Sequence, residues 1–220
     1  VQKPDLAADG QAMVSCLSSD MSPAADPSYV VVSGLYHVEQ GTSMSAPAIS
    51  GACALLLQGK RKFSNTGLPP DSTRRLLQNT AIDMATPGFD YTTGAGFIQA
   101  SKAMRTFAVP NPTATELVLL NPSITPGTQQ IQINVNGNYF DQTSVVTFRG
   151  QPVPTTVVNG SQLLATIPTF NGNPAIQVYT PPISSSQLDG GFSNSLYFFT
   201  PVKKNVVVTA NNITKKYGEK

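Results

Sequence analysis

The pattern of apolar and polar positions divides the sequence near residue 108. In the first half, residues 46–57 are apolar on every side, which is typical of a buried helix. Pro47 is compatible with such a helix only in the first turn, where its missing N–H costs nothing. We therefore expect this helix to begin near Ser43.

Two further helices are expected before residue 108. The stretch PPDSTRRLLQNTA, residues 69–81, predicts a helix with Leu76 and Leu77 facing inward and with Asp71 or Ser72 as its N-terminal cap. A shorter helix is expected over residues 97–107. The opening residues 5–16 favour a strand and a turn, and residues 21–34 favour a loop followed by a short strand.

After residue 108 the pattern alternates with period two. Ile131, Ile133 and Val135 lie on one face of an expected strand, and Asn159-Gly160 is a strong hairpin signal. The further strands are expected at residues 144–148, 153–158, 162–167, 175–179 and 195–199. Short strands at this regular spacing are typical of a small β-sandwich. Residues 201–204 read as a linker, and residues 205–220 begin another strand-rich unit.

Composition narrows the classes of function. Charged residues make up 12% of the chain, against roughly 25% in an average soluble domain, and the net charge is +2. This small charge gives no indication of nucleic acid or an anionic membrane as partner. The longest apolar run is too short for a membrane span. Cys16 and Cys53 could form a disulfide or remain free.

No metal site or cofactor is expected. Asp20, Asp26 and Asp90 lack the spacing of a calcium loop, and the single histidine, His37, is too little for a zinc site with the two cysteines. The basic residues 60–62 suit the end of a helix, where cations face the negative end of the helix dipole.

Residues 39–51, EQGTSMSAPAISG, carry the candidate chemistry. A serine becomes a nucleophile when a base removes its proton and a nearby site stabilises the oxyanion. The free N–H groups of a helix N-terminus can stabilise the oxyanion, and Ser43 is expected at such an N-terminus. Gly41 would let the backbone approach a substrate closely. The alternative is that Thr42 or Ser43 only caps the helix.

Four segments in the first half resemble the subtilases, the subtilisin-like serine proteases. GTSMSAPAISGACALL resembles the motif around the catalytic serine, KPDLAADG resembles the strand and turn that precede it, and LLQNTA and GAGFIQASKAM resemble the two segments that follow. The sequence departs from the family at Ala48, where a histidine is usual, and at Asp9, where a proline is usual.

The resemblance implies that Ser43 is the nucleophile of a serine endopeptidase and that Gly41, Thr42 and Ser43 form the oxyanion and substrate-backbone site. The family's aspartate, histidine and oxyanion asparagine would come from an upstream part of the same catalytic domain, so residues 1–220 alone are expected to be inactive. The substrate would be a polypeptide, and the protein would be secreted or on the surface of a bacterial cell. The alternative is a surface adhesion or display protein with a vestigial protease half.

Other residues are weaker candidates for the missing parts of a catalytic triad. His37 precedes Ser43 by six residues, and a base from so close in the chain would need a tight turn, so we expect a loop residue. The acid of the triad could be a nearby carboxylate, but none of the candidates lies in a matching motif: Glu39, Asp5, Asp9 and Asp20.

The second half resembles another known module. Residues 116–200, with INVNGNYF, SVVTFRGQPVP and QLLATIP, resemble the IPT/TIG domain, an immunoglobulin-like sandwich, and residues 205–220 resemble the start of an MBG-type repeat. The expected fold is thus α/β, as the C-terminal portion of a subtilisin-like parallel-sheet domain over 1–108, followed by an all-β immunoglobulin-like sandwich over 109–201 and a further β-rich repeat over 202–220. The aromatic residues of the sandwich are expected to pack in its core or edges: Tyr139, Phe140, Phe148 and Phe170.

Overall fold

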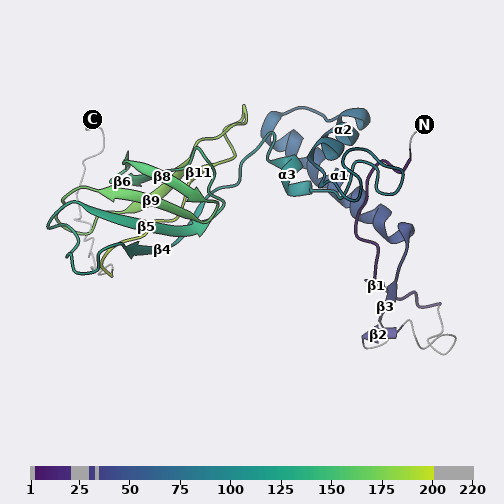
Figure 1. Ribbon diagram of the computed structural model, residues 1–220, viewed down its shortest axis with the longest axis horizontal. Coiled ribbons are helices and arrows are strands. Elements are labelled where there is room, and N and C mark those ends of the chain that lie inside the picture. The colour runs from purple at the N-terminus through teal and green to yellow at the C-terminus, as the bar shows by residue number, and fades with distance from the viewer. Residues whose placement is uncertain (1–2, 21–29, 33–34, 201–220) are drawn as a thin grey trace, which may run out of the picture.

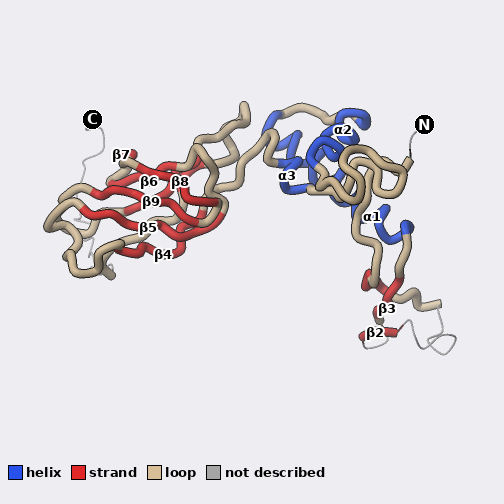
Figure 2. The backbone as a smooth tube through the Cα atoms, in the orientation of Figure 1, coloured by secondary structure: helices blue, strands red, loops and turns tan. Residues whose placement is uncertain are grey.

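The computed structural model describes residues 3–20, 30–32 and 35–200 (Figure 1). The first half of the chain forms three helices, which we call the helical part, and a small sheet. The second half forms two larger sheets (Figure 2). The linker expected at 201–204 and the strand-rich unit expected at 205–220 lie outside the described residues.

The helical part consists of α1 (Thr42–Ser64), α2 (Pro70–Thr80) and α3 (Ala100–Met104). These helices meet around Leu56, Leu77 and Ala103, each of which is at most 1% exposed. The inward orientation expected for Leu76 and Leu77 is confirmed, since Leu76 is partly buried against the same cluster. The third helix is shorter than the expected range 97–107, because only residues 100–104 are helical and turns follow.

The first helix begins at Thr42, next to the expected start near Ser43, but two details expected for the helix starts are wrong. Pro47 is the sixth residue of α1 and not part of its first turn, so the carbonyl of Ser43 lacks the N–H donor that an ordinary residue would offer it. Neither Asp71 nor Ser72 caps α2. That helix begins at Pro70, with Pro69 as its N-terminal cap, and proline's fixed φ suits the first turn without a side-chain cap.

The small sheet contains β1 (Met13–Cys16), β2 (Val30–Val32) and β3 (Tyr36–Glu39) in the order β1-β3-β2. Its strands pair antiparallel, and β3 is the central strand. Figure 1 shows this sheet extending away from the three helices. Parallel pairing in the described part of the first half is limited to one bridge, between Ala7 and Phe97.

Two four-stranded antiparallel sheets form the second half, which we call the sandwich. One has the order β4-β5-β9-β8 and the other β11-β10-β6-β7. The bounds of these strands are β4 Thr113–Leu119, β5 Ile131–Asn138, β6 Val145–Phe148, β7 Gln151–Pro152, β8 Thr155–Asn159, β9 Gln162–Ile167, β10 Ile176–Thr180 and β11 Gly191–Phe192.

The core of the sandwich lies between its two sheets. Alternate residues of β5 and β9 point into it, as the period-two pattern predicts, and Ile133, Val135 and Leu163 are fully buried. Phe140, Phe148 and Phe170 are buried as expected, whereas Tyr139 is 51% exposed. The hairpin expected at Asn159-Gly160 is confirmed, because β8 and β9 pair antiparallel across it.

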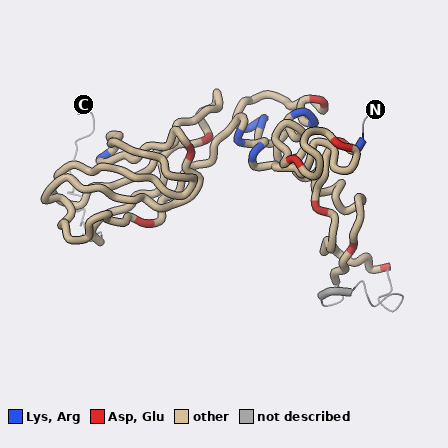
Figure 3. The backbone as a smooth tube through the Cα atoms, in the orientation of Figure 1, with Lys and Arg blue, Asp and Glu red and all other residues tan. Residues whose placement is uncertain are grey.

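One expected strand is absent, and the strands β3, β4, β7 and β11 were not expected. Residues 195–199 form only a single bridge, between Leu196 and Ile176. The strand β4 was not expected from its sequence, TATELVL. Figure 3 shows basic positions gathered in the helices and only isolated charges in the two sheets. Among the described residues, no helix combines the length and the apolar character needed to cross a membrane.

Candidate active site

Ser43 lies exposed in the first turn of α1. Gly41 is the N-terminal cap, and its φ of 140° is a conformation that residues with a Cβ rarely adopt. No side chain caps the helix, and its first turn contains no acidic residue. The alternative that Thr42 or Ser43 only caps the helix is therefore wrong. The N–H groups of Met44 and Ser45 donate to the Gly41 carbonyl. Those of Thr42 and Ser43, at the very start of α1, have no helical partner.

The segment KPDLAADG packs directly against the start of α1. The Gly41 N–H donates to the carbonyl of Gly10 at 2.8 Å, and Ser45 Oγ donates to the carbonyl of Ala8 at 3.1 Å. A Cβ on Gly10 would lie 2.6 Å from the Gly41 oxygen and would also clash with Ser45 Oγ. Glycine is therefore needed at position 10 for this close approach.

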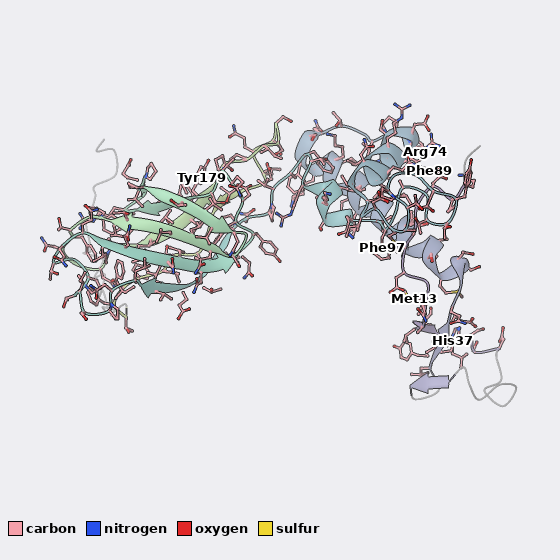
Figure 4. All side chains as sticks on the ribbon, viewed as in Figure 1. Met13, His37, Arg74, Phe89, Phe97 and Tyr179 are labelled. Atoms are coloured by element: carbon pink, nitrogen blue, oxygen red, sulfur yellow. The ribbon has the colours of Figure 1, made fainter. Side chains whose placement is uncertain are left out.

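The other two motif segments join the same assembly. The Ala7 N–H donates to Gly96 at 2.9 Å, and Ile98 N–H donates to Ala7 at 3.0 Å. Phe97 then exchanges two hydrogen bonds of 2.8 Å with Ile82, at the end of LLQNTA. Figure 4 shows Phe97 close to the helices of this region. All four segments that resemble the subtilases are thus held together by backbone hydrogen bonds.

His37 does not act on Ser43 in this structure. It lies in β3, where its backbone pairs with Ser15 and Val30, away from the helices (Figure 4). Its Nε2 lies 3.6 Å from Glu39 Oε1, and its buried Nδ1 has no hydrogen-bond partner among the described residues. The described residues therefore contain no histidine that could take the proton of Ser43.

The carboxylates considered for the triad are occupied by other partners. Asp5 pairs with Lys3 and lies 3.8 Å from Arg74. Asp9 accepts from the N–H of Gln11 at 3.3 Å, and Asp20 accepts from the hydroxyl of Ser19. Of the four carboxylates considered, Glu39 lies beside His37, and the other three pair with no histidine in the described part of the chain.

Asp90, a candidate calcium ligand, organises its own turn. Its carboxylate accepts from the N–H and hydroxyl of Thr93 and from the N–H of Thr92, at 2.7–2.8 Å. These hydrogen bonds, that of the Thr93 N–H first, lower the pKa of Asp90. Of the other two candidates, Asp20 lies in a separate turn beside Ser18 and Ser19, and Asp26 lies outside the described residues.

An apolar groove runs beside α1. It has a volume of about 530 Å³ and is lined chiefly by Leu6, Ile49, Cys53, Leu57 and Leu68. Leu57 of this lining is 38% exposed and the nearby Leu55 is 57% exposed, although Leu56 between them is fully buried. The all-round apolar helix is thus covered on one side only. Cys53 and Cys16 are both free thiols.

The arrangement at the start of α1 can stabilise negative charge beside an exposed hydroxyl. The Ser43 N–H and the positive end of the helix dipole face the site, and neither is consumed by a cap. Ser45 and Gly10 contribute to this geometry, although sequence reasoning assigned them no role. Their contact joins positions 35 residues or more apart, and no local pattern indicates such a pairing.

Part of the chain is similar to known proteins. Residues 1–96 match the model of the Subtilase family. The chain is 43% identical to fervidolysin of Fervidobacterium pennivorans over 72 residues, which are 33% of this chain and 10% of that protein. It is 44% identical over 64 residues to the Neisserial autotransporter lipoprotein NalP of Neisseria meningitidis, covering 29% of this chain and 6% of that protein.

A solved structure also matches. The crystal structure of fervidolysin, described as a keratinolytic enzyme related to subtilisin, aligns with a TM-score of 0.34 and 26% sequence identity. The alignment covers 78% of this chain and 24% of that one. The chain therefore spans a quarter or less of the length of these relatives. The Subtilase family model thus matches residues 1–96, the part of the chain that contains Ser43, and these relatives include a keratinolytic enzyme related to subtilisin.

Proposed function

We propose that this chain supplies the nucleophile of a subtilisin-like serine endopeptidase and that the nucleophile is Ser43. The observation that carries the proposal is the exposed Ser43 at an uncapped helix N-terminus, built by the packing of the four motif segments against one another. A serine that served as a cap would be hydrogen-bonded to the helix, and this one is free to react.

In the proposed mechanism, Ser43 Oγ attacks the carbonyl carbon of a peptide bond while a base takes its proton. The carbonyl oxygen becomes an oxyanion, which the Ser43 N–H and the helix N-terminus stabilise. The amine leaves with the proton from the base, and water then releases the acyl group from Ser43. Gly41 and Thr42 contact the substrate backbone.

The base and its orienting acid come, in this proposal, from an upstream part of the same catalytic domain. Two observations support that partner. The described residues offer Ser43 no histidine, and the groove beside α1 exposes apolar side chains that a neighbouring layer of the domain would cover. Residues 1–220 alone are then catalytically inactive.

The sandwich is proposed to be an IPT/TIG-type, immunoglobulin-like module of a secreted or cell-surface bacterial protease, followed by an MBG-type repeat from residue 202. Two antiparallel sheets around one core support the sandwich assignment. The low charge and the likeness of 64 residues of this chain to NalP, an autotransporter lipoprotein by name, support the location.

Substitution of Ser43 tests the function in the whole protein that contains these residues. Ser43→Ala should abolish peptide hydrolysis, a loss on the order of 10⁶ in kcat by analogy with a removed triad serine. Ser50→Ala is the matched control, because Ser50 lies in the same helix and only donates to the Ala46 carbonyl at 3.1 Å. Equal hydrolysis by both variants would contradict the proposal, and no hydrolysis by the unmodified protein would favour the adhesion or display alternative.

A further inference from the structure

The loop between β10 and β11, residues 181–190, reaches back from the sandwich to the end of the helical part. At its centre is Asp189, whose residue surface is only 2% exposed. The Asp189 carboxylate accepts from the N–H of Val109 at 2.9 Å, from the N–H of Ile183 at 3.1 Å, and from the N–H and hydroxyl of Ser184. Val109 belongs to the connection between α3 and β4, which we call the α3–β4 linker. One buried carboxylate therefore joins the 181–190 loop to this linker.

The α3–β4 linker is held through both backbone polar groups of Val109. While the Val109 N–H donates to Asp189, the Val109 carbonyl accepts from the N–H of Gly190 at 2.9 Å. Gly190 has a φ of 61°, and a Cβ there would lie 2.5 Å from the Thr180 oxygen. The loop therefore depends on a glycine to present its N–H to the linker.

The loop also touches α1. The N–H of Ser186 donates to the carbonyl of Phe63 at 3.3 Å, and Phe63 is the penultimate residue of that helix. Carbonyls in the last turn of a helix have no helical partner, so the loop satisfies one of them. Next to this contact lies an open cleft of about 210 Å³, lined by Phe63, Met104 and Tyr139 among others.

In the described part of the chain, no common apolar core holds the helical part and the sandwich together. The core around Leu56 and Leu77 and the core around Ile133 and Val135 share no residue among those described. The polar contacts of the 181–190 loop do cross between them. Hydrogen bonds to a buried carboxylate are stronger and more directional than neutral ones, so they are suited to fixing an orientation.

We propose that the 181–190 loop is a clasp that docks the sandwich on the end of the helical part, with Asp189 as its positioning residue. The sandwich is then a fixed extension of the protease segment and not a freely swinging appendage. The clasp extends the rigid sandwich N-terminally to Val109, four residues before β4 begins.

Backbone ¹⁵N relaxation of the whole chain tests the clasp at neutral pH. Amides of residues 42–104 and of residues 113–192 should share one rotational correlation time in the unmodified chain. Asp189→Asn replaces the acceptor pair by an amide and should give each part its own, shorter correlation time. It should also speed hydrogen exchange of the Val109 amide about 10- to 100-fold, the factor for a hydrogen bond to a charged group.

Two variants serve as comparisons. Ser184→Ala removes a hydroxyl donor to Asp189 but leaves the Val109 bond, so common tumbling should persist. Val109→Pro removes the hydrogen bond from the Val109 N–H to Asp189 without changing Asp189. It therefore tests the clasp even if Asp189→Asn unfolds the sandwich. Separate tumbling in the unmodified chain overturns the proposal, as does common tumbling in a folded Asp189→Asn or Val109→Pro variant.

Discussion

Ser45 Oγ donates a hydrogen bond of 3.1 Å to the carbonyl oxygen of Ala8, across 37 positions of the chain. This contact ties the turn that ends KPDLAADG to the first turn of α1, two residues after the candidate nucleophile. The start of α1 is therefore positioned by a distant segment and not by a cap of its own. The geometry at Ser43 depends on this contact and on the glycine beside it.

Gly10→Ala should destabilise the helical part. The added Cβ would meet Ser45 Oγ and the Gly41 oxygen, so one of the two segments must shift, at a cost of about 1–3 kcal/mol. Gly51→Ala is the control, since a Cβ there has nothing within 4 Å and alanine favours a helix interior by about 0.5–1 kcal/mol. Urea unfolding followed by helical circular dichroism measures both, and a Gly10→Ala variant as stable as the parent would contradict the packing described.

The sandwich should fold without the helical part. Residues 109–200 contain both sheets and their common core, so this segment should give a β-type circular dichroism spectrum and one cooperative melt. Within it, Ile133→Ala should cost about 2–5 kcal/mol, because the side chain is fully buried. Val118→Ala should change stability by about 0.5 kcal/mol or less, since Val118 is exposed. A random-coil spectrum would rule out this boundary.

Asp189 should make the stability of the sandwich pH-dependent. Burial raises the pKa of Asp189, but the hydrogen bonds from Ser184, Val109 and Ile183 outweigh burial and lower it overall. A carboxyl whose folded pKa lies below the unfolded value of about 3.9 stabilises the fold above that value. Its contribution is lost as the pH falls through the folded pKa.

The stability difference between the parent chain and Asp189→Asn should accordingly be constant near neutral pH and shrink below about pH 4. Urea unfolding of the sandwich at several pH values measures it. Asp141→Asn is a suitable comparison, because the Asp141 carboxylate accepts hydrogen bonds only from Thr143, within its own turn. A difference that grows on acidification would show that Asp189 is not held as a carboxylate.

The 220-residue chain should exchange its α1 amides faster than its sandwich amides. Leu55 and Leu57 are exposed, and each exposed leucine forfeits roughly 1.5–3 kcal/mol of burial. The core of the sandwich is by contrast enclosed between two sheets. Hydrogen exchange resolved by residue compares the two directly. Equal or slower exchange across residues 44–57 in a monomer would contradict the interpretation that α1 lacks a covering layer.

Much of this architecture could be predicted where the pattern is local. The strands β5 and β9 follow the alternation of Ile131, Ile133 and Ile167, and the inward face of α2 follows Leu76 and Leu77. The start of α1 was predicted to within one residue, but the first-turn position predicted for Pro47 is wrong, because α1 tolerates a proline further in than propensity suggests. The core around β5 and the start of α1 were therefore predictable from the sequence, and the place of Pro47 in the helix was not.

Non-local contacts explain the remaining differences. Residues 195–199 have strand-like composition, but the side chains of Ser193 and Asn194 form hydrogen bonds with backbone groups of β10 and β4. Ser193 Oγ accepts from Val178 N–H, and Asn194 bonds both the N–H and the carbonyl of Ala114. The contact of Ser45 with Ala8 and the clasp at Asp189 likewise join distant positions. No spacing in the sequence indicates either of them.

Covalent labelling of Ser43 is the most direct test of the proposed nucleophile. A fluorophosphonate probe, applied to the whole protein that contains these residues, should modify Ser43 and abolish hydrolysis, with the modified residue located by mass spectrometry of its peptide. The 220-residue chain alone should stay unlabelled, because its described residues offer Ser43 no base. Labelling at another serine, or full inhibition with Ser43 unmodified, would contradict the account.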